Sequence, residues 1–208
     1  MQKPVILVGG GGHCKSVIEA TESAGYDILG ILDLPELIGT RTLNYEVIGS
    51  DADVAKHVGK ADFVVTVGFI RNPNLRIKLH ENITNNGGKL ATIIASTAQV
   101  SKYAEIGEGS VVLHNTCVNA GAKVGKGVII NTASNIEHDV VVGDYTHIST
   151  GAMINGDCKV GANTFIGSNA VLVNGVTVCD NCVVGAGAIV TKDITEPGTY
   201  VGCPVRKL

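Results

Sequence analysis

Aliphatic residues recur at every sixth position over the second half of the chain. Starting at Ile94 and stepping by six, every position up to Val190 holds Ile, Val or Leu. A period of six fits neither an α-helix nor a half-buried strand, whose side chains repeat every 3.6 and every two residues. It is typical of a triangular solenoid, in which each hexapeptide forms one flat face and one corner. We expect a continuous core of stacked columns made by Ile94, Val100, Ile106, Val112, Val118, Val124, Ile130, Ile136, Val142, Ile148, Ile154, Val160, Ile166, Leu172, Val178, Val184 and Val190.

The neighbours of each aliphatic position support the same repeat. The residue two places before it is nearly always small, as at Ser134 and Ala152, and the residue after it is often Gly or Asn, as at Gly143. Small residues fit the corners, and we expect the Gly and Asn residues to supply the turn conformations. The register does not slip between residues 94 and 190, so about five coils of 18 residues are predicted, with no long loop between them.

The first 88 residues show a different pattern, in which short apolar runs alternate with helical segments. Strands are expected at 5–8, 28–32 and 63–67, and helices at 13–24, 51–58 and 74–83. Such alternation indicates a parallel sheet with helices on its faces. We therefore predict a Rossmann-like α/β domain over residues 1–88, followed by an all-β parallel β-helix over residues 89–208.

Composition excludes several classes of function. The formal net charge of -3 argues against nucleic acid as a partner. No apolar run approaches the roughly 18 residues that a membrane span needs, and the N-terminus does not resemble a signal peptide, so we expect a cytoplasmic protein. Cys179 and Cys182 form a CxxC pair, but no second pair accompanies it and the nearest histidines are distant in sequence. Core thiols are the favoured interpretation of the six cysteines, and no metal is expected.

The repeat resembles that of the hexapeptide-repeat acyltransferases, whose fold is a left-handed parallel β-helix. The ending 201–206 (VGCPVR) is similar to the G-x-P-A-[KR] ending of that family, with Val205 in place of Ala. An N-terminal strand followed by Gly10-Gly11-Gly12-His13 and a helix narrows the resemblance. Nucleotide-4-amino-sugar N-acetyltransferases, which modify 4-amino-4,6-dideoxy sugars, and the related sialic acid O-acetyltransferases share that arrangement. The segment 131–147 is the most specific part.

The resemblance implies an acetyltransferase that uses acetyl-CoA to acetylate the 4-amino group of a nucleotide-linked sugar, with a UDP-sugar favoured as acceptor. It also implies a homotrimer in which acetyl-CoA lies in the groove between neighbouring β-helices. The N-terminal domain is then expected to hold the nucleotide of the acceptor.

His138 is the candidate general base. An imidazole with an ordinary pKa of about 6.5 suits removal of a proton near neutral pH. His138 lies two positions after the core residue Ile136, on the outside of a coil. Asp139 follows directly and is expected to accept a hydrogen bond from the second ring nitrogen, although Glu137 competes for that role. The resemblance favours Asp139, because the family pattern has His followed by an acid.

Four further residues are assigned to the cofactor by the resemblance. His147 is expected to contact the thioester end of acetyl-CoA. The N–H of Gly156 is expected to donate to the thioester carbonyl oxygen. Ser168 and Ala186, on successive coils above, are expected to line the pantetheine channel.

The acceptor is assigned to the N-terminal domain. Gly9 and Gly11 are followed by Cys14 where the dinucleotide fingerprint G-x-G-x-x-G requires its third glycine, which argues against NAD. Glycines at the start of a helix still allow a pyrophosphate to approach the backbone. The expected acceptor-binding residues follow strand ends on one edge of the sheet, with Asn131 added from the β-helix to orient the substrate: Gly10, Gly11, Gly12, His13, Asp33, Gly68, Arg71 and Asn131.

Three alternatives stay open. The first is an O-acyltransferase that acts on sialic acid, serine or tetrahydrodipicolinate, although the alternating N-terminal domain favours a nucleotide sugar. The second is a zinc enzyme similar to the γ-carbonic anhydrases, for which His114, His138 and His147 are available, but their spacing does not match that family. The third is a non-catalytic scaffold, which leaves the His138-Asp139 pair unexplained.

Overall fold

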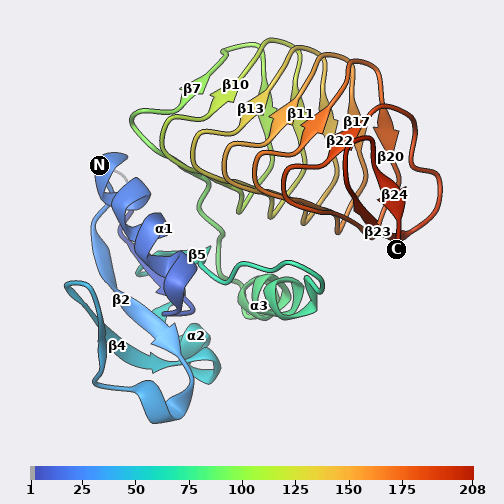
Figure 1. Ribbon diagram of the computed structural model, residues 1–208. Coiled ribbons are helices and arrows are strands. Elements are labelled where there is room, and N and C mark those ends of the chain that lie inside the picture. Colours follow the sequence, from blue (N-terminus) through green and yellow to red (C-terminus); the bar gives the residue numbers. More distant parts are fainter. Residues whose placement is uncertain (1–2) are drawn as a thin grey trace.

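The computed structural model describes residues 3–208, which form two parts (Figure 1). The first part is a five-stranded sheet with helices on both faces, and the second is a left-handed parallel β-helix. The first coils of the β-helix lie beside the N-terminal part, and the C-terminus lies at the far end of the last coils. Both predicted folds are confirmed.

The N-terminal sheet has the strand order β3-β4-β2-β1-β5. Its strands are β1 (Val5–Val8), β2 (Ile28–Asp33), β3 (Arg41–Thr42), β4 (Tyr45–Ser50) and β5 (Asp62–Val65). All neighbours pair in parallel except β3, which pairs antiparallel with β4. The β3-β4 hairpin was not predicted from the sequence. Its turn contains Leu43 at a φ of 50°, where a glycine would have indicated a turn.

Helices cover both faces of this sheet. The helical elements are α1 (Gly12–Ser23), η1 (Pro35–Leu37), η2 (Asp51–Asp53), α2 (Val54–His57) and α3 (Asn74–Asn85). Side chains of α1 pack on one face, whereas α2 and α3 pack on the other. The helix expected at 51–58 is instead a 3₁₀ turn and a single α-helical turn, which begin at a capping box between Ser50 and Asp53.

Three parallel sheets form the faces of the β-helix. Corresponding residues of successive coils are 18 apart, as for Val118, Ile136 and Ile154. Two-residue strands dominate: β6 (Ile93–Ile94), β7 (Gln99–Val100), β8 (Glu105–Ile106), β9 (Val111–Val112), β10 (Cys117–Val118), β11 (Lys123–Val124), β12 (Ile129–Ile130), β13 (Asn135–Ile136), β14 (Val141–Val142), β15 (His147–Ile148), β16 (Met153–Ile154), β17 (Lys159–Val160), β18 (Phe165–Ile166), β19 (Val171–Leu172), β20 (Thr177–Val178), β21 (Cys182–Val184), β22 (Ile189–Val190), β23 (Gly198–Val201) and β24 (Arg206–Lys207).

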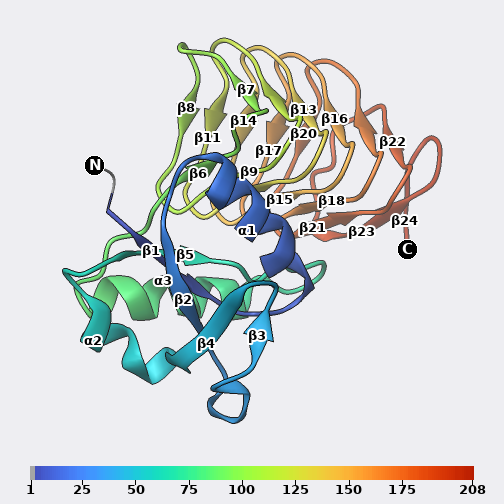
Figure 2. The ribbon, with the colours of Figure 1, turned by 90° about the vertical axis from the view of Figure 1, so that its left-hand side faces the viewer.

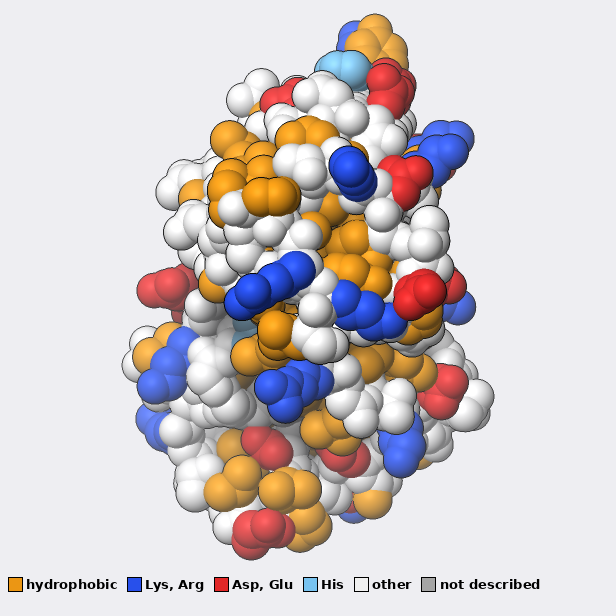
Figure 3. Space-filling view, turned by 45° about the vertical axis from the view of Figure 1, so that its right-hand side comes forward, with side chains coloured by type: hydrophobic (Ala, Val, Ile, Leu, Met, Phe, Trp, Pro, Cys, Tyr) orange, Lys and Arg blue, Asp and Glu red, His pale blue; other side chains and the backbone are white. Residues whose placement is uncertain are grey.

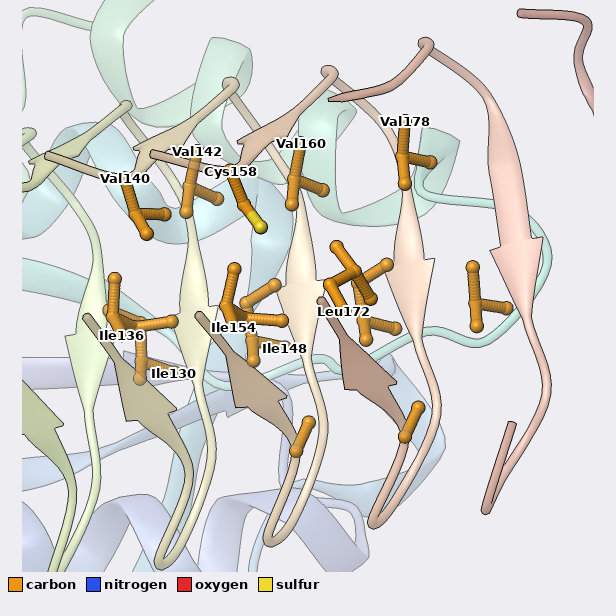
Figure 4. Packing of buried hydrophobic residues seen from close by; sticks show 14 of the residues in the cluster. Ile130, Ile136, Val140, Val142, Ile148, Ile154, Cys158, Val160, Leu172 and Val178 are labelled. Atoms are coloured by element: carbon orange, nitrogen blue, oxygen red, sulfur yellow. The ribbon is translucent and has the colours of Figure 1, made fainter. Parts of the chain in front are cut away.

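The predicted aliphatic columns form the core of the β-helix. From Val112 to Val190 every residue in the six-residue phase is buried, and Figure 4 shows the columns meeting across the prism. The first coil is less buried, because it has no coil below it: 37% of the surface of Ile94 is exposed, and Val100 and Ile106 are partly buried. Ile93, the neighbour of Ile94, points outward instead and packs against the N-terminal domain.

The corners differ in one respect from the expectation. Left-handed backbone conformations occur three residues after the core position, as at Asn115, Asp139 and Asn163, and not one residue after it. Glycine directly after the core position is required for a reason other than turn conformation. A Cβ at Gly107 would lie 2.4 Å from the carbonyl carbon of Gly125, so glycine is required by the close approach of adjacent coils.

The two parts are joined by strand pairing and by a shared apolar cluster. Phe63 N donates to Lys89 O, and Phe63 O accepts from Ala91 N. The segment after residue 88 therefore pairs with the outer side of β5 and extends the N-terminal sheet. Helix α1 lies between the sheet and the β-helix (Figure 2), and its cluster includes Ile93 and Leu113. A boundary at residue 88 stays a prediction.

Candidate functional site

A cavity of about 470 Å³ lies where the N-terminal domain meets the β-helix. Strand β1 has β2 on one side and β5 on the other, so the order of the sheet reverses there. Open parallel sheets bind ligands at such a point, beyond the carboxyl ends of the strands. The lining comes from the segments after β1 and β5 and from two β-helix residues: Gly11, Gly12, His13, Thr66, Val67, Gly68, Phe69, Ile70, Asn131 and His147.

The glycine turn after β1 leaves the start of α1 open to this cavity. Gly9 has a φ of 104°, and a Cβ there would lie 2.4 Å from Val67 Cγ2. Around Gly11 and Gly12 there is free space, since a Cβ at either would meet no atom within 4 Å. Helix α1 has no side-chain cap, so its first N–H groups are available to an anion.

Two neutral imidazoles form the floor of the cavity. His13 and His147 have ring centroids 6.1 Å apart. Burial lowers the pKa of His13 to about 3 and that of His147 to about 4. His147 Nδ1 lies 2.8 Å from Phe69 O, so Nδ1 carries the proton and donates it. Its Nε2 then accepts from Asn131 Nδ2 at 3.2 Å.

A second constellation surrounds His138. Its Nδ1 lies 3.0 Å from Asp139 Oδ2, and both side chains are more than half exposed. Glu137 turns elsewhere, because its carboxylate accepts from Asn119 Nδ2 and Asn135 Nδ2, both at 2.7 Å. The pKa of His138 is raised, first by the hydrogen bond to Asp139 and further by the charges of nearby carboxylates.

Gly156 lies directly above His138 on the next coil. A Cβ at Gly156 would lie 2.5 Å from His138 Nε2, so the free ring nitrogen faces the glycine backbone. The Gly156 N–H makes none of the backbone hydrogen bonds found among residues 3–208, while its carbonyl accepts from Gly175 N at 2.9 Å. An unpaired N–H beside the imidazole Nε2 is an arrangement that suits acyl transfer.

The residues expected to bind acetyl-CoA divide between two edges of the prism. The corners at 131–134, 149–152, 167–170 and 185–188 form one edge, which we call the Asn131 edge. It carries Ser168 and Ala186, and Ser168 Oγ lies 3.0 Å from Ser149 Oγ. The corners at 137–140, 155–158 and 173–176 form the His138 edge, which carries Gly156. The six-stranded face with β13 and β16 separates the two edges within one chain.

Comparisons with known proteins agree with this architecture. The model of the PglD N-terminal domain matches residues 4–83, and that of the hexapeptide repeat of succinyl-transferase matches residues 158–192. The acetyltransferase domain of PglB from Neisseria gonorrhoeae, solved with acetyl coenzyme A, is 33% identical with a TM-score of 0.92, and each chain is covered completely. The chain belongs to the hexapeptide-repeat acetyltransferases with a PglD-type N-terminal domain.

Two further solved structures extend the comparison. PerB from Caulobacter crescentus, solved with CoA and GDP-perosamine, is 29% identical with a TM-score of 0.92, over 99% of this chain and 97% of that one. WeeI from Acinetobacter baumannii is 25% identical with a TM-score of 0.81, and both chains are fully covered. A search of curated proteins gave no significant match.

Several predicted residues lie outside the cavity of this acetyltransferase. Gly10, Asp33 and Arg71 do not line it. Asp33 accepts from Gly10 N at 2.6 Å and from Leu34 N at 2.8 Å, so its carboxylate holds the glycine turn in place. His114 bonds to Thr97 at 2.8 Å.

Among residues 3–208 no group of three or more His, Cys, Asp or Glu side chains is placed to hold a metal, and no helix is long and apolar enough to cross a membrane.

Sequence reasoning missed part of the site. Phe69 and Ile70 line the cavity, and the Phe69 carbonyl fixes the tautomer of His147. The only sequence signal for them is their position directly after Gly68 at a strand end. Arg76, which joins the two domains, is detectable as a charged residue on the apolar face of a helix, with Leu79 and Ile83.

Replacing Asp139 with asparagine is expected to move the pH dependence of the acetyltransferase. A general base works in its neutral form, so the rate rises with pH through the pKa of His138. The hydrogen bond to Asp139 is the first cause that raises this pKa. Asparagine can still accept from Nδ1 but carries no charge, so the bond stabilises the imidazolium less and the acid limb of kcat/KM shifts to lower pH. We expect a smaller shift for Asp157→Asn, whose charge acts without a hydrogen bond. If the acid limb of kcat/KM in Asp139→Asn were the same as in the wild type, Asp139 would not set the pKa of the general base.

Proposed function

We propose that this enzyme transfers the acetyl group of acetyl-CoA to the 4-amino group of a nucleotide-linked 4-amino-4,6-dideoxy sugar. The observation that carries the proposal is the pairing of two sites: a cavity at the switch point of the N-terminal sheet, and an imidazole with a carboxylate partner on the β-helix. The full-length similarity to PerB, which was solved with CoA and GDP-perosamine, supports this pairing.

In this proposal the acceptor nucleotide occupies the N-terminal cavity. The unpaired N–H groups at the start of α1 bind the pyrophosphate, which suits the positive end of a helix dipole. His13 and His147 are neutral at physiological pH and therefore recognise the sugar by hydrogen bonds and ring contacts and not by charge. For His147 this role replaces the contact with the thioester end of acetyl-CoA that the resemblance implies, because His147 lines the same cavity as His13. Asn131 holds His147 from the β-helix side.

His138 acts as the general base on the acceptor amine. Its Nε2 takes the proton that the amine loses as the amide bond forms, and Asp139 stabilises the resulting imidazolium through Nδ1. The Gly156 N–H donates to the thioester carbonyl oxygen, which gains negative charge during attack. The thiolate of CoA is the leaving group. No residue of the chain forms a covalent bond to the acetyl group.

An active site that uses residues of both edges then requires a second copy of the chain. Within one prism the His138 edge cannot reach the cavity beside the Asn131 edge, because a whole face lies between them. In a homotrimer the His138 edge of one copy faces the Asn131 edge of the next, and acetyl-CoA lies between them. Exposed apolar side chains such as Val141 and Met153 support such packing, and Figure 3 shows apolar groups interspersed with Lys and Arg on one side of the molecule.

Gly12→Glu tests the assignment of the cavity to the acceptor. The free space around Gly12 admits a side chain without backbone strain, and a carboxylate there repels a pyrophosphate. We expect KM for the nucleotide sugar to rise by roughly tenfold or more, with KM for acetyl-CoA changed less than about twofold. Equal rises in both KM values would contradict the assignment.

The acceptor itself is tested by an acetyl-CoA assay against a panel of sugars. The panel pairs UDP- with GDP-linked 4-amino sugars and each amine with its 4-hydroxy analogue. The family resemblance favours a UDP-sugar, while GDP is the alternative because PerB was solved with GDP-perosamine. An amide product supports N-acetylation, and an ester from the hydroxy analogue at equal kcat/KM would favour the O-acetyltransferase alternative. A cytoplasmic location stays a prediction from the sequence.

A further inference from the structure

Arg76 is a buried cation at the junction between the two domains. It lies on the buried face of α3, and 1% of its surface is exposed. Burial lowers its pKa to about 9, so it stays charged at neutral pH. None of the ion pairs among residues 3–208 involves Arg76. A buried charge without a carboxylate is an expensive way to stabilise a fold, which points to a more specific role.

The guanidinium group bonds to backbone carbonyls of both domains. On the N-terminal side, Nη1 donates to Val65 O at 2.7 Å and to Val67 O at 3.0 Å. On the β-helix side, Nε donates to Gly127 O at 2.9 Å, and Nη2 makes a longer contact of 3.5 Å with Gly109 O. One planar side chain therefore links the end of β5 to the corners of two successive coils.

The β-helix is shaped to receive α3 at this point. The corners that bond Arg76 belong to a column of left-handed residues spaced by 18: Gly109, Gly127, Tyr145, Asn163 and Asn181. Glycine occurs only at the two corners beneath α3. A Cβ at Gly109 would lie 2.8 Å from His80 Cε1. One at Gly127 would lie 2.6 Å from the Tyr145 ring and 3.2 Å from His80 Cε1. These two glycines thus allow α3 to approach the β-helix closely.

The carbonyls held by Arg76 lead directly into the cavity. Val67 lines the cavity itself and is followed by the loop 68–70, whose Phe69 carbonyl accepts the Nδ1 proton of His147. A continuous set of contacts therefore runs from Arg76 through this loop to the imidazole that faces the acceptor.

We infer that Arg76 is a positioning residue that fixes the cavity loop 66–70 against the β-helix and thereby sets the place and tautomer of His147 in the acceptor site. The inference rests on the proposed function only for the identity of the acceptor. The contacts of Arg76 are with the N-terminal loop and with the corners at Gly109 and Gly127, so the edges assigned to acetyl-CoA are not involved.

Lysine cannot replace Arg76 in this role. Its ammonium is a single point with three donors, whereas the guanidinium reaches carbonyls on opposite sides with separate nitrogens. Arg76→Lys keeps the charge and loses the link, and Arg76→Met removes both. Lys78→Met is the matched control, because it removes an exposed cation from the same helix without touching the junction.

The test combines steady-state kinetics with NMR of the full-length protein carrying ¹⁵N-labelled histidine. In Arg76→Lys we expect KM for the nucleotide sugar to rise by roughly tenfold, with KM for acetyl-CoA within about twofold. The Nδ1–H signal of His147, present in the wild type, is expected to be shifted or lost. A merely structural role would lower the active fraction, and so kcat, while both KM values and the His147 signal of the folded protein stay unchanged.

The outcomes separate this inference from the proposed function. An unchanged His147 signal in Arg76→Lys, or equal changes in both KM values, overturns the role of Arg76. If no nucleotide sugar is acetylated, the proposed function fails, and the NMR signal alone decides on Arg76. If Arg76→Met does not fold, the KM values and the His147 signal of Arg76→Lys alone test the role of Arg76. Lys78→Met should match the wild type in every measurement.

Discussion

Replacing His138 with alanine is expected to lower kcat by roughly 10²- to 10⁴-fold, the usual contribution of a general base. The side chain is 57% exposed, and among residues 3–208 it bonds only to Asp139, so its removal leaves the core and the corners intact. Circular dichroism and the sedimentation coefficient should therefore match the wild type. The loss should appear in kcat at saturating concentrations of both substrates, since His138 acts on the reacting amine.

His57→Ala is a suitable control, because His57 lies in α2 of the N-terminal domain and outside the cavity. It should retain wild-type kcat. A wild-type kcat in His138→Ala with saturating substrates would remove His138 from the mechanism, and the exposed His138-Asp139 pair would then have no catalytic role.

Gly156→Ala is expected to cause a loss of similar size, at least about 10²-fold in kcat. The added Cβ would lie 2.5 Å from His138 Nε2, a distance at which the imidazole has to move away. The backbone at Gly156 is not in the left-handed region, so alanine adds no conformational strain there. The Tm should change little, because the side chain that has to move is exposed.

The double variant His138→Ala/Gly156→Ala shows whether the glycine acts through the imidazole. Alanine at 156 keeps the backbone N–H, so once the imidazole is gone the second substitution should cost nothing further. Losses that multiply in the double variant would mean that the alanine disturbs the path of acetyl-CoA itself.

The architecture was largely accessible from the sequence. The six-residue period is a strong signal because each aliphatic residue occupies the same column of one core, from Val112 to Val190. The positions of the turn residues at the corners are less evident from the sequence. Gly143 follows a core residue because a Cβ there would meet the backbone of the next coil at 2.5 Å, and such inter-coil spacing is not visible in a local pattern.

The spacing of 18 also contains information on the site. His138 and Gly156 differ by 18, so they are neighbours on successive coils. Ser168 follows Gly156 by 12, which is two thirds of a coil and places it on another edge. Gly156 therefore cannot line one channel with Ser168 and Ala186 within a single chain. The repeat is compatible with the expected groove between two copies.

The cavity at the domain junction was less predictable. Its glycines follow strand ends, which is a local signal, but the contact of Phe69 O with His147 joins residues 78 apart in sequence. Arg76 donates to Gly127 O, 51 residues away in sequence, and has no acidic partner within the part of the chain that the structure describes. Contacts between two separately folded parts leave no periodic pattern in the sequence.

Catalysis at the proposed shared site requires His138 of one copy to act on the acceptor held by another copy. His138→Ala and Gly12→Glu impair opposite halves of that site. At an acceptor concentration well below KM, pure His138→Ala should be nearly inactive and pure Gly12→Glu should keep at most about a tenth of the wild-type rate. Mixed trimers formed by co-expression in equal amounts should regain about one quarter of the wild-type sites, since random assembly joins an intact His138 edge to an intact cavity at that frequency. Recovery of this activity, proportional to the fraction of mixed trimers, is the result we predict. No activity above that of the pure variants in any mixture, with mixed trimers shown to be present by mass spectrometry, would place the whole site within one chain and contradict the account.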